Sequence, residues 1–114
     1  MRMERFGFGP EDAFTPRDER LEGVTIAPLT APGPPQAAIF RLGPGGRIAR
    51  HPAVVPQVLA VLDGSGLVSG GDGAFRPIGA GEAVFWAAGE QHETVTDHGL
   101  TALIVEAAEL RPAG

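Results

Sequence analysis

The sequence predicts an all-β domain, a sandwich or barrel. The chain of 114 residues holds 17 Gly and 11 Pro but only two Met, no Tyr and no Cys, so turns interrupt it often and leave little room for long helices. From Leu21 onward, short β-prone runs alternate with turn signals at the regular spacing of a sandwich or barrel. The length allows one domain with a single core.

An N-terminal arm, residues 1–20, precedes the β domain, which we place at residues 21–110. The arm is polar and irregular. Thr15 as an N-cap and Pro16 at the first helical position predict one short helical turn within it. Its three phenylalanines are expected to dock on the barrel or on a second subunit, because free arms rarely carry so many aromatic residues; they are Phe6, Phe8 and Phe14.

The strands and turns of the β domain follow from local pattern. The predicted strands are residues 21–29, 36–43, 46–51, 57–64, 65–71, 74–79, 82–87, 92–97 and 100–108. Tight connections are expected at the glycine-rich stretches 43–46, 63–66, 70–73 and 79–81. Residues 57–62 and 100–105 are apolar at nearly every position. We therefore expect the interior to cover one face of these two strands and a second sheet or subunit to cover the other.

Composition excludes several function classes. Nine basic and fourteen acidic residues give a net charge of −5, and the scattered basic residues form no footprint for nucleic acid. No apolar run approaches the roughly 20 residues of a membrane span, and the start of the chain lacks the hydrophobic segment of a secretory signal. We expect a soluble, cytoplasmic protein. Because the chain has no Cys, any metal must be held by His, carboxylate, amide oxygen or water.

Glycines, two histidines and one glutamine recur at fixed spacings in two stretches: Gly45, His51, Gln57 and Gly64 in the first, and Gly81, Gly89 and His92 in the second. These spacings resemble the two motifs of the cupins, and the resemblance covers roughly residues 36–107. It implies a double-stranded β-helix, or jelly-roll, barrel. It also implies a divalent metal ion bound by the motif histidines and glutamate, and a homodimer.

The sequence departs from the cupin pattern at several positions. Ala53 stands in place of the second histidine of the first motif, Gln57 in place of its glutamate, and Ala87 in place of the proline of the second motif. If His51 is instead read as the second histidine, Ala49 replaces the first. The implied metal site is then reduced to His51, His92 and the Gln57 side-chain oxygen, and the candidate metals are zinc, nickel, iron and manganese.

Such a site has predictable properties. Imidazole and amide ligands are neutral, so no carboxylate offsets the desolvation of a divalent ion and its affinity falls. The same shortage of ligands leaves coordination positions open for water or a substrate, which suits a Lewis acid. Glu93 and Glu106 are the nearest acids in the sequence. Strand alternation puts Glu93 on the face opposite His92, so we expect it at the rim of the pocket or behind the ligands. The role of Glu106 stays open.

The same residues have simpler interpretations. His51, which precedes a proline, could be a loop histidine, whereas His92 shares a polar strand face with Thr94 and Thr96 that would be unusual in a solid core. A buried Gln57 amide needs a metal, a histidine or a water as partner. Trp86 is a wall residue or lines the cavity mouth. Acidic pairs in the arm, Glu11 with Asp12 and Asp18 with Glu19, are expected to be solvated.

The sequence is compatible with three functions. The first is a metal-dependent enzyme acting on a small oxygen-bearing molecule, and the second is a metal-free module that binds or senses such a molecule. The third is a structural or regulatory dimer whose pocket is residual. Fold alone does not choose between them.

Overall fold

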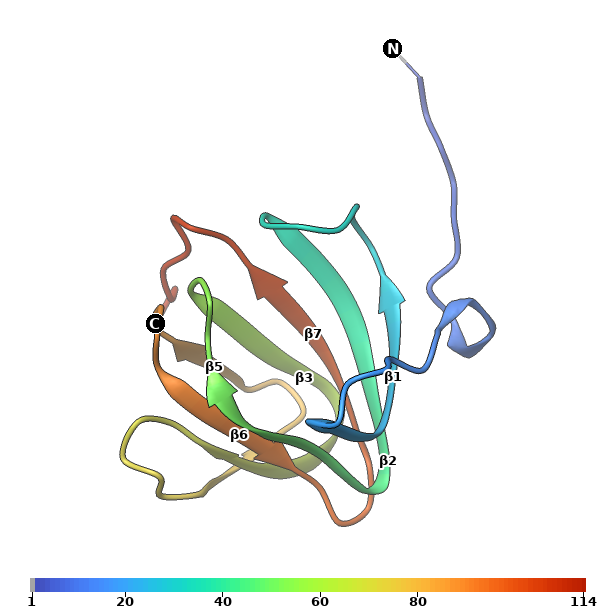
Figure 1. The fold of residues 1–114 in the computed structure, drawn as a ribbon. Coiled ribbons are helices and arrows are strands. Elements are labelled where there is room, and N and C mark those ends of the chain that lie inside the picture. The colour runs from blue at the N-terminus through green and yellow to red at the C-terminus, as the bar shows by residue number, and fades with distance from the viewer. Residues whose placement is uncertain (1) are drawn as a thin grey trace.

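Seven antiparallel strands close into a barrel in the computed structural model, which describes residues 2–114 (Figure 1). The all-β prediction is confirmed. The strands are β1 (Leu21–Pro28), β2 (Gln36–Pro52), β3 (Gln57–Ser69), β4 (Arg76–Gly79), β5 (Ala83–Trp86), β6 (Gln91–Val95) and β7 (Leu100–Glu106). No helix in the described part of the chain has the length and apolar character needed to cross a membrane.

The barrel closes because its two longest strands bend and each belongs to both of its walls. The first part of β2 pairs with β7 and its last residues pair with β6, while β1 pairs with both parts. Likewise β3 pairs first with β5 and β7, then with β4 and β6. This is the jelly-roll arrangement, in which each wall covers the apolar face of the other.

Two of the predicted turns are wrong. The glycine-rich stretches 43–46 and 63–66 lie inside β2 and β3, which run through them without ending. Gly45 has φ +76° and Gly64 has φ +80°, a conformation that lets a strand bend sharply where a residue with a side chain would be strained. Local pattern does not distinguish this use of glycine from a hairpin. The stretches 70–73 and 79–81 do connect strands, from β3 to β4 and from β4 to β5.

The arm contains one short helix, but not where the sequence predicted it. The 3₁₀ helix η1 spans Pro10–Asp12, ahead of the predicted turn at Thr15. The Asp18 carboxylate accepts a hydrogen bond from the Arg20 backbone N–H at 3.0 Å, and the Leu21 N–H donates to the Asp18 carbonyl at 3.0 Å. The segment after Thr15 therefore forms a tight turn that leads directly into β1.

The arm reaches the barrel mainly through its backbone. Phe14 and Ile26 exchange two backbone hydrogen bonds of 2.9 Å, and Arg41 Nη2 donates to the Phe8 carbonyl at 3.1 Å. The rings of Phe6, Phe8 and Phe14 stay exposed, with relative exposures of 64%, 48% and 51%. Within one chain the aromatic rings are thus not buried on the barrel as expected, and burial against a second subunit stays a prediction.

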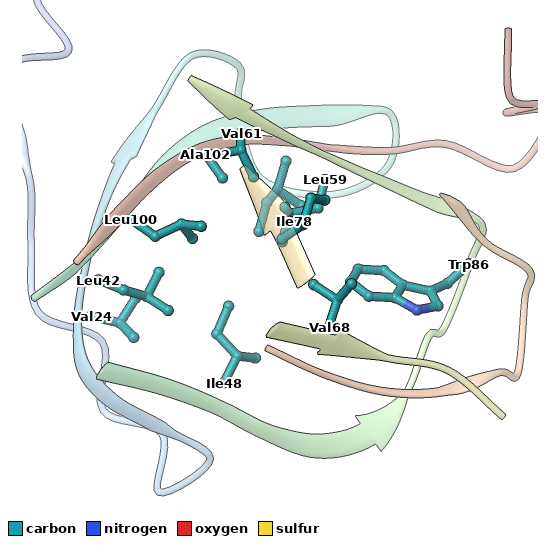
Figure 2. Close-up of a cluster of buried hydrophobic side chains, with 11 residues drawn as sticks. Val24, Leu42, Ile48, Leu59, Val61, Val68, Ile78, Trp86, Leu100 and Ala102 are labelled. Atoms are coloured by element: carbon teal, nitrogen blue, oxygen red, sulfur yellow. The ribbon is translucent and has the colours of Figure 1, made fainter. Parts of the chain in front are cut away.

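The interior beside the bends is a continuous apolar core (Figure 2). Its buried members are Val24, Leu42, Ile48, Leu59, Val61, Val68, Ile78, Trp86, Leu100, Ala102 and Ile104. In residues 57–61 of β3 and in β7 only alternate residues are buried, and the outward residues between them, such as Val58 and Leu103, are partly exposed. Within residues 2–114 no second sheet covers these outer faces. A subunit that covers them stays a prediction.

We predict that Gly64→Ala lowers the free energy of unfolding by about 2 kcal/mol or more, because a Cβ there meets the Gly99 backbone carbonyl and φ is positive. Gly71→Ala is the control, since its Cβ would meet nothing closer than 3.7 Å. Chemical denaturation of both variants measures the difference. Equal stability of the two would contradict the role given to Gly64 in bending β3.

Candidate functional site

A cavity of about 110 Å³ opens at one end of the barrel beside the core. Its volume is close to that of about four water molecules in the liquid. The walls mix apolar, charged and amide side chains from the arm and from β1, β2, β3, β6 and β7. The lining residues are Asp18, Arg20, Leu21, Phe40, Ile48, His51, Gln57, His92, Thr94, Ile104 and Glu106.

Strand pairing brings the two motif histidines together. His51 near the end of β2 is the register partner of His92 in β6, and their ring centroids lie 4.4 Å apart at an interplanar angle of 52°. A bulge in β2 between Ile48 and His51 shifts the register just before this pair. A bulge re-aims the side chains that follow it. Here it brings both imidazoles to the cavity.

The hydrogen bonds of the two imidazoles decide which nitrogen faces the cavity. His51 Nδ1 lies 2.7 Å from the Ala49 carbonyl oxygen, and His92 Nδ1 lies 3.2 Å from the Glu90 carbonyl oxygen. A carbonyl only accepts, so each Nδ1 carries the proton and donates it. In the neutral ring the lone pair is then on Nε2. Neither Nε2 atom has a hydrogen-bond partner among residues 2–114.

Trp86 holds His92 from behind and does not line the cavity. The two ring systems lie 4.4 Å apart at 30°, and the indole Nε1 donates to the Ser69 carbonyl at 3.1 Å. Trp86 and His92 are each 2% exposed. Burial lowers the pKa of His92 below its usual value of 6.5, and His51 adds a smaller effect in the same direction. His92 is therefore neutral near pH 7 and keeps its Nε2 lone pair.

A second polar group enters the cavity from β3 and β7. Gln57 is buried, and its Nε2 donates to Glu106 Oε1 at 2.8 Å. Gln36 Nε2 donates to the other oxygen of Glu106 at 3.4 Å. These residues share one row of the sheet, because Glu106 is the register partner of both glutamines. Glu106, whose role the sequence left open, is thus the partner that the buried Gln57 amide required, in place of a metal, a histidine or a water.

The residues that follow His92 in the sequence differ in where their side chains lie. Thr94 is 1% exposed and lines the cavity, as its position two residues after His92 predicts. Thr96 is buried elsewhere, where it donates to the Ser65 carbonyl at 2.7 Å and accepts from the Gly99 N–H at 2.9 Å. Glu93 lies outside the cavity and pairs with Arg47 Nε at 3.0 Å. Glu93 thus lies on the face opposite His92, as strand alternation predicts, and its assignment to the rim of the pocket is wrong.

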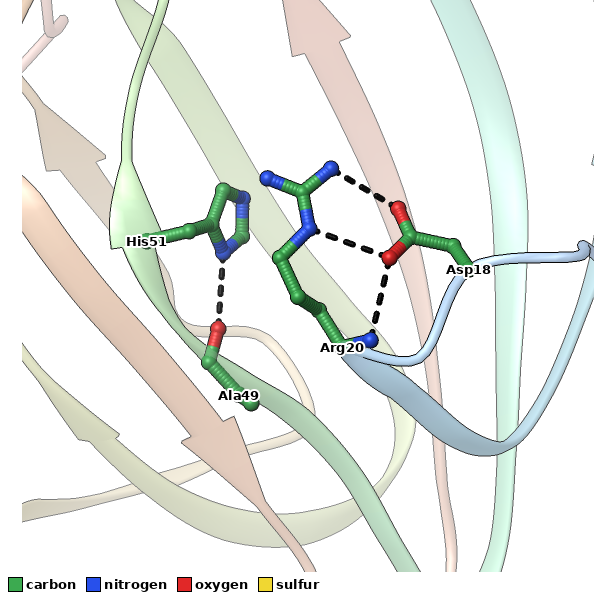
Figure 3. A network of polar contacts seen from close by, with 4 residues as sticks. All are labelled: Asp18, Arg20, Ala49 and His51. Atoms are coloured by element: carbon green, nitrogen blue, oxygen red, sulfur yellow. Dashed lines mark hydrogen bonds and ion pairs between the residues drawn. The ribbon is translucent and has the colours of Figure 1, made fainter.

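Sequence reasoning missed the contribution of the arm. Asp18 and Arg20 line the cavity beside His51, although Asp18 was expected to be solvated (Figure 3). Hydrogen bonds from the Arg20 side chain and backbone lower the pKa of Asp18 to about 2. The Ala49 N–H donates to the Arg20 carbonyl at 2.7 Å, so the arm is attached at the bulge of β2. The Asp-x-Arg spacing predicts the local turn but carries no signal for its place at the barrel mouth.

A divalent metal ion would find an incomplete set of ligands. His51 and His92 each offer a free Nε2, which is the usual imidazole donor, and the bond at Nδ1 is the usual support of a metal-bound histidine. In the described chain, however, no three His, Asp or Glu side chains come together as a metal site. Gln57 adds only a neutral amide oxygen, and its NH₂ is committed to Glu106. The residues fit a weakly held ion that takes its remaining ligands from solvent or a bound molecule.

Known structures share this fold. The polyketide cyclase RemF from Streptomyces resistomycificus is 26% identical, with a TM-score of 0.80 over 97% of this chain and 83% of that one. A cupin-2 domain protein from Rhodospirillum rubrum is 20% identical, with a TM-score of 0.75 over 98% of this chain and 80% of that one. A predicted oxalate decarboxylase from Thermotoga maritima is 25% identical, with a TM-score of 0.62 over 73% of this chain and 80% of that one. No protein-family model and no curated protein sequence matches the chain.

We predict that Glu106→Leu destabilises the fold by about 1–3 kcal/mol, because it leaves the buried Gln57 amide without its partner. Gln57→Leu combined with Glu106→Leu is expected to recover most of the loss, since neither polar group then remains. A double-mutant cycle from chemical denaturation measures the coupling. Purely additive effects would show that the two side chains do not depend on each other.

We predict that the free energy of unfolding falls as the pH is lowered from 7 to 5. The pKa of His92 is lowered in the folded state, so the unfolded chain takes up the proton more readily. The stability that neutral His92 contributes is therefore present above pH 6.5 and is lost as the pH falls towards the pKa of the folded state. The limiting slope for one proton is about 1.4 kcal/mol per pH unit. Asp18 affects stability over a different pH range, because the stability that its carboxylate contributes is lost only as the pH falls below 3.8.

Denaturation of chelator-treated protein at a series of pH values checks this prediction. His92→Gln should remove the slope between pH 7 and 5, and the exposed His98→Gln should leave it in place. A profile that His92→Gln does not alter would assign the slope to another group.

Proposed function

We propose that this chain, a single-domain protein with the cupin fold, binds a small oxygen-bearing molecule in the histidine-lined cavity of its barrel. The observation that carries the proposal is the pair of unpaired imidazole Nε2 atoms, held by carbonyl bonds at Nδ1 and lining one cavity. A histidine that served only for packing would have no need of a free, fixed nitrogen beside an open space. Lone pairs held in this way at the wall of a cavity are free to accept a hydrogen bond from a bound molecule.

The hydrogen-bonding groups of the cavity wall indicate which kind of molecule it binds. The two Nε2 atoms, the Glu106 carboxylate and the Gln57 amide oxygen are all hydrogen-bond acceptors. An acceptor-rich wall binds either a cation or a molecule that presents hydroxyl donors. The apolar residues Phe40 and Ile104 on the same cavity offer contact for a carbon skeleton. A small hydroxylated molecule satisfies both parts of the wall.

The second candidate function is that of a weak divalent metal centre held by His51 and His92, with Gln57 as a third donor. The bonds at both Nδ1 atoms favour it, because they direct each Nε2 lone pair as a metal ligand requires. Zinc, nickel, iron and manganese are the candidates. When bound, the ion would supply a Lewis acid that polarises an oxygen of the bound molecule.

The alternative of a purely structural dimer receives less support. A residual pocket should be filled by side chains, whereas this cavity has about 110 Å³ of open space beside buried polar groups. Dimerisation remains compatible with a working pocket, since the partly exposed residues Val58 and Leu103 lie on the outside of the barrel. We propose a homodimer that covers this outer face.

The test combines metal content with ligand binding on untagged protein purified without chelator. Elemental mass spectrometry is expected to find well under one divalent ion per chain. After chelator treatment, an NMR titration with butan-2-ol should shift the amide signals of His51 and His92, at millimolar affinity for so small a probe. His51→Ala with His92→Ala should abolish these shifts, and His98→Ala, away from the cavity, should not.

Two results would change the conclusion. Near-stoichiometric metal that disappears in the double variant would make the metal centre the leading function. Protein that holds no metal, refuses added zinc, nickel, manganese and ferrous iron, and shows no shifts with the alcohol would overturn both candidates.

A further inference from the structure

The hydrogen-bonding groups of the cavity are divided between its depth and its mouth. His92 and Thr94 are almost fully buried, whereas the side chains of Asp18 and Arg20 are 31% and 54% exposed. His92 and the buried Gln57 therefore place acceptors in the depth, whereas His51 and Glu106, which are also acceptors, are partly buried. The mouth carries a guanidinium, a group that only donates.

Arg20 is fixed in this place by contacts at both its backbone and its side chain. Its carbonyl accepts from the Ala49 N–H at 2.7 Å, and the Ala49 carbonyl in turn accepts from His51 Nδ1 at 2.7 Å. Its Nε and Nη2 donate to the two Asp18 oxygens at 3.0 and 2.8 Å. The backbone of the single residue Ala49 thus connects Arg20 to His51. The guanidinium is held by Asp18 in a two-point, planar contact.

The contact with Asp18 leaves part of the guanidinium free. Of its five N–H groups only two are used by Asp18, and Nη1 has no hydrogen-bond partner among residues 2–114. Figure 3 shows this nitrogen on the side of the guanidinium that faces the His51 ring. Nη1 and the remaining N–H of Nη2 form an edge with the geometry that binds a carboxylate.

We infer that Arg20 determines specificity by binding the carboxylate of a small hydroxy acid whose hydroxyl group lies deeper in the cavity, at the two imidazoles. This inference rests on the proposed function and names the class of its ligand. A molecule with a donor at one end and a carboxylate at the other matches the polarity of the cavity. Leu21, Phe40 and Ile48 line the space between and contact the carbon chain.

The size of the cavity and the charges on its wall restrict the class of hydroxy acid further. A cavity comparable with about four water molecules takes a short chain and leaves the carboxylate at the mouth. Asp18 already offsets the charge of Arg20, and Glu106 adds a negative charge to the wall of the cavity. A dicarboxylate would put a second negative charge beside Glu106. The ligand is therefore a monocarboxylate, held by directed hydrogen bonds and not by a net positive field.

The experiment uses three matched probes on chelator-treated protein: 3-hydroxybutyrate, butyrate without the hydroxyl, and butan-2-ol without the carboxylate. NMR titration of each gives an affinity. 3-Hydroxybutyrate should bind most tightly. Arg20→Gln should weaken it about tenfold and leave butan-2-ol unchanged. Arg17→Gln, an exposed arginine of the same arm that does not line the cavity, is the control and should change neither.

The outcomes separate this inference from the function on which it rests. If butan-2-ol binds and Arg20→Gln leaves the affinity of 3-hydroxybutyrate unchanged, Arg20 does not bind the carboxylate and the inference is overturned, while the pocket stands. A tighter affinity for butan-2-ol than for 3-hydroxybutyrate in the wild type would also overturn it. Failure of all three probes to bind would overturn the inference together with the binding function. A circular dichroism spectrum of each variant confirms that it is folded.

Discussion

The pairing of β2 with β6 is the constraint on which the site depends. It closes one wall of the barrel, and its register sets His51 opposite His92. A shift of β2 by one residue against β6 would turn His51 to the outer face and separate it from His92, because side chains alternate along a strand. The bulge before His51 corrects the register at this point, and the Arg20 carbonyl takes the Ala49 N–H there. The same interaction that completes the sheet thus also positions the arm at the mouth of the cavity.

Most of the buried polar groups of the interior gather at the cavity, apart from the apolar core. Apolar side chains fill the barrel beside the strand bends, and the polar ones form rows set by the same register: His51 with His92, and Gln57 with Glu106 and Gln36. A buried amide and carboxylate are tolerated because they bond to each other. Among the groups of these rows, the two imidazole Nε2 atoms have no hydrogen-bond partner in the described chain. These unpaired nitrogens beside otherwise paired polar groups distinguish a binding site from a packed core.

Sequence reasoning predicted more of the fold than of the site. The resemblance of two stretches to the cupin motifs implied the jelly-roll barrel and singled out His51, Gln57 and His92, all of which line one cavity. It failed where one residue type serves two purposes. Glycines 43–46 and 63–66 signal a turn or a bend equally well, and the barrel uses both stretches to bend a continuous strand. An acidic residue gives no signal in the sequence of whether it lines a cavity or faces solvent. Glu106 therefore could not be placed, and Asp18 was expected to be solvated.

The sequence by itself determined the all-β class, the strands that carry the histidines, and the face each residue takes along its own strand, because these follow from local conformational preference and from the period of two along a strand. Only the tertiary structure decided which strands become neighbours. Gln57 meets Glu106 across 49 residues of chain, and Arg20 meets the bulge of β2 from outside the barrel domain. Contacts of this kind depend on how the barrel closes, and chain closure is a property of all the strands together.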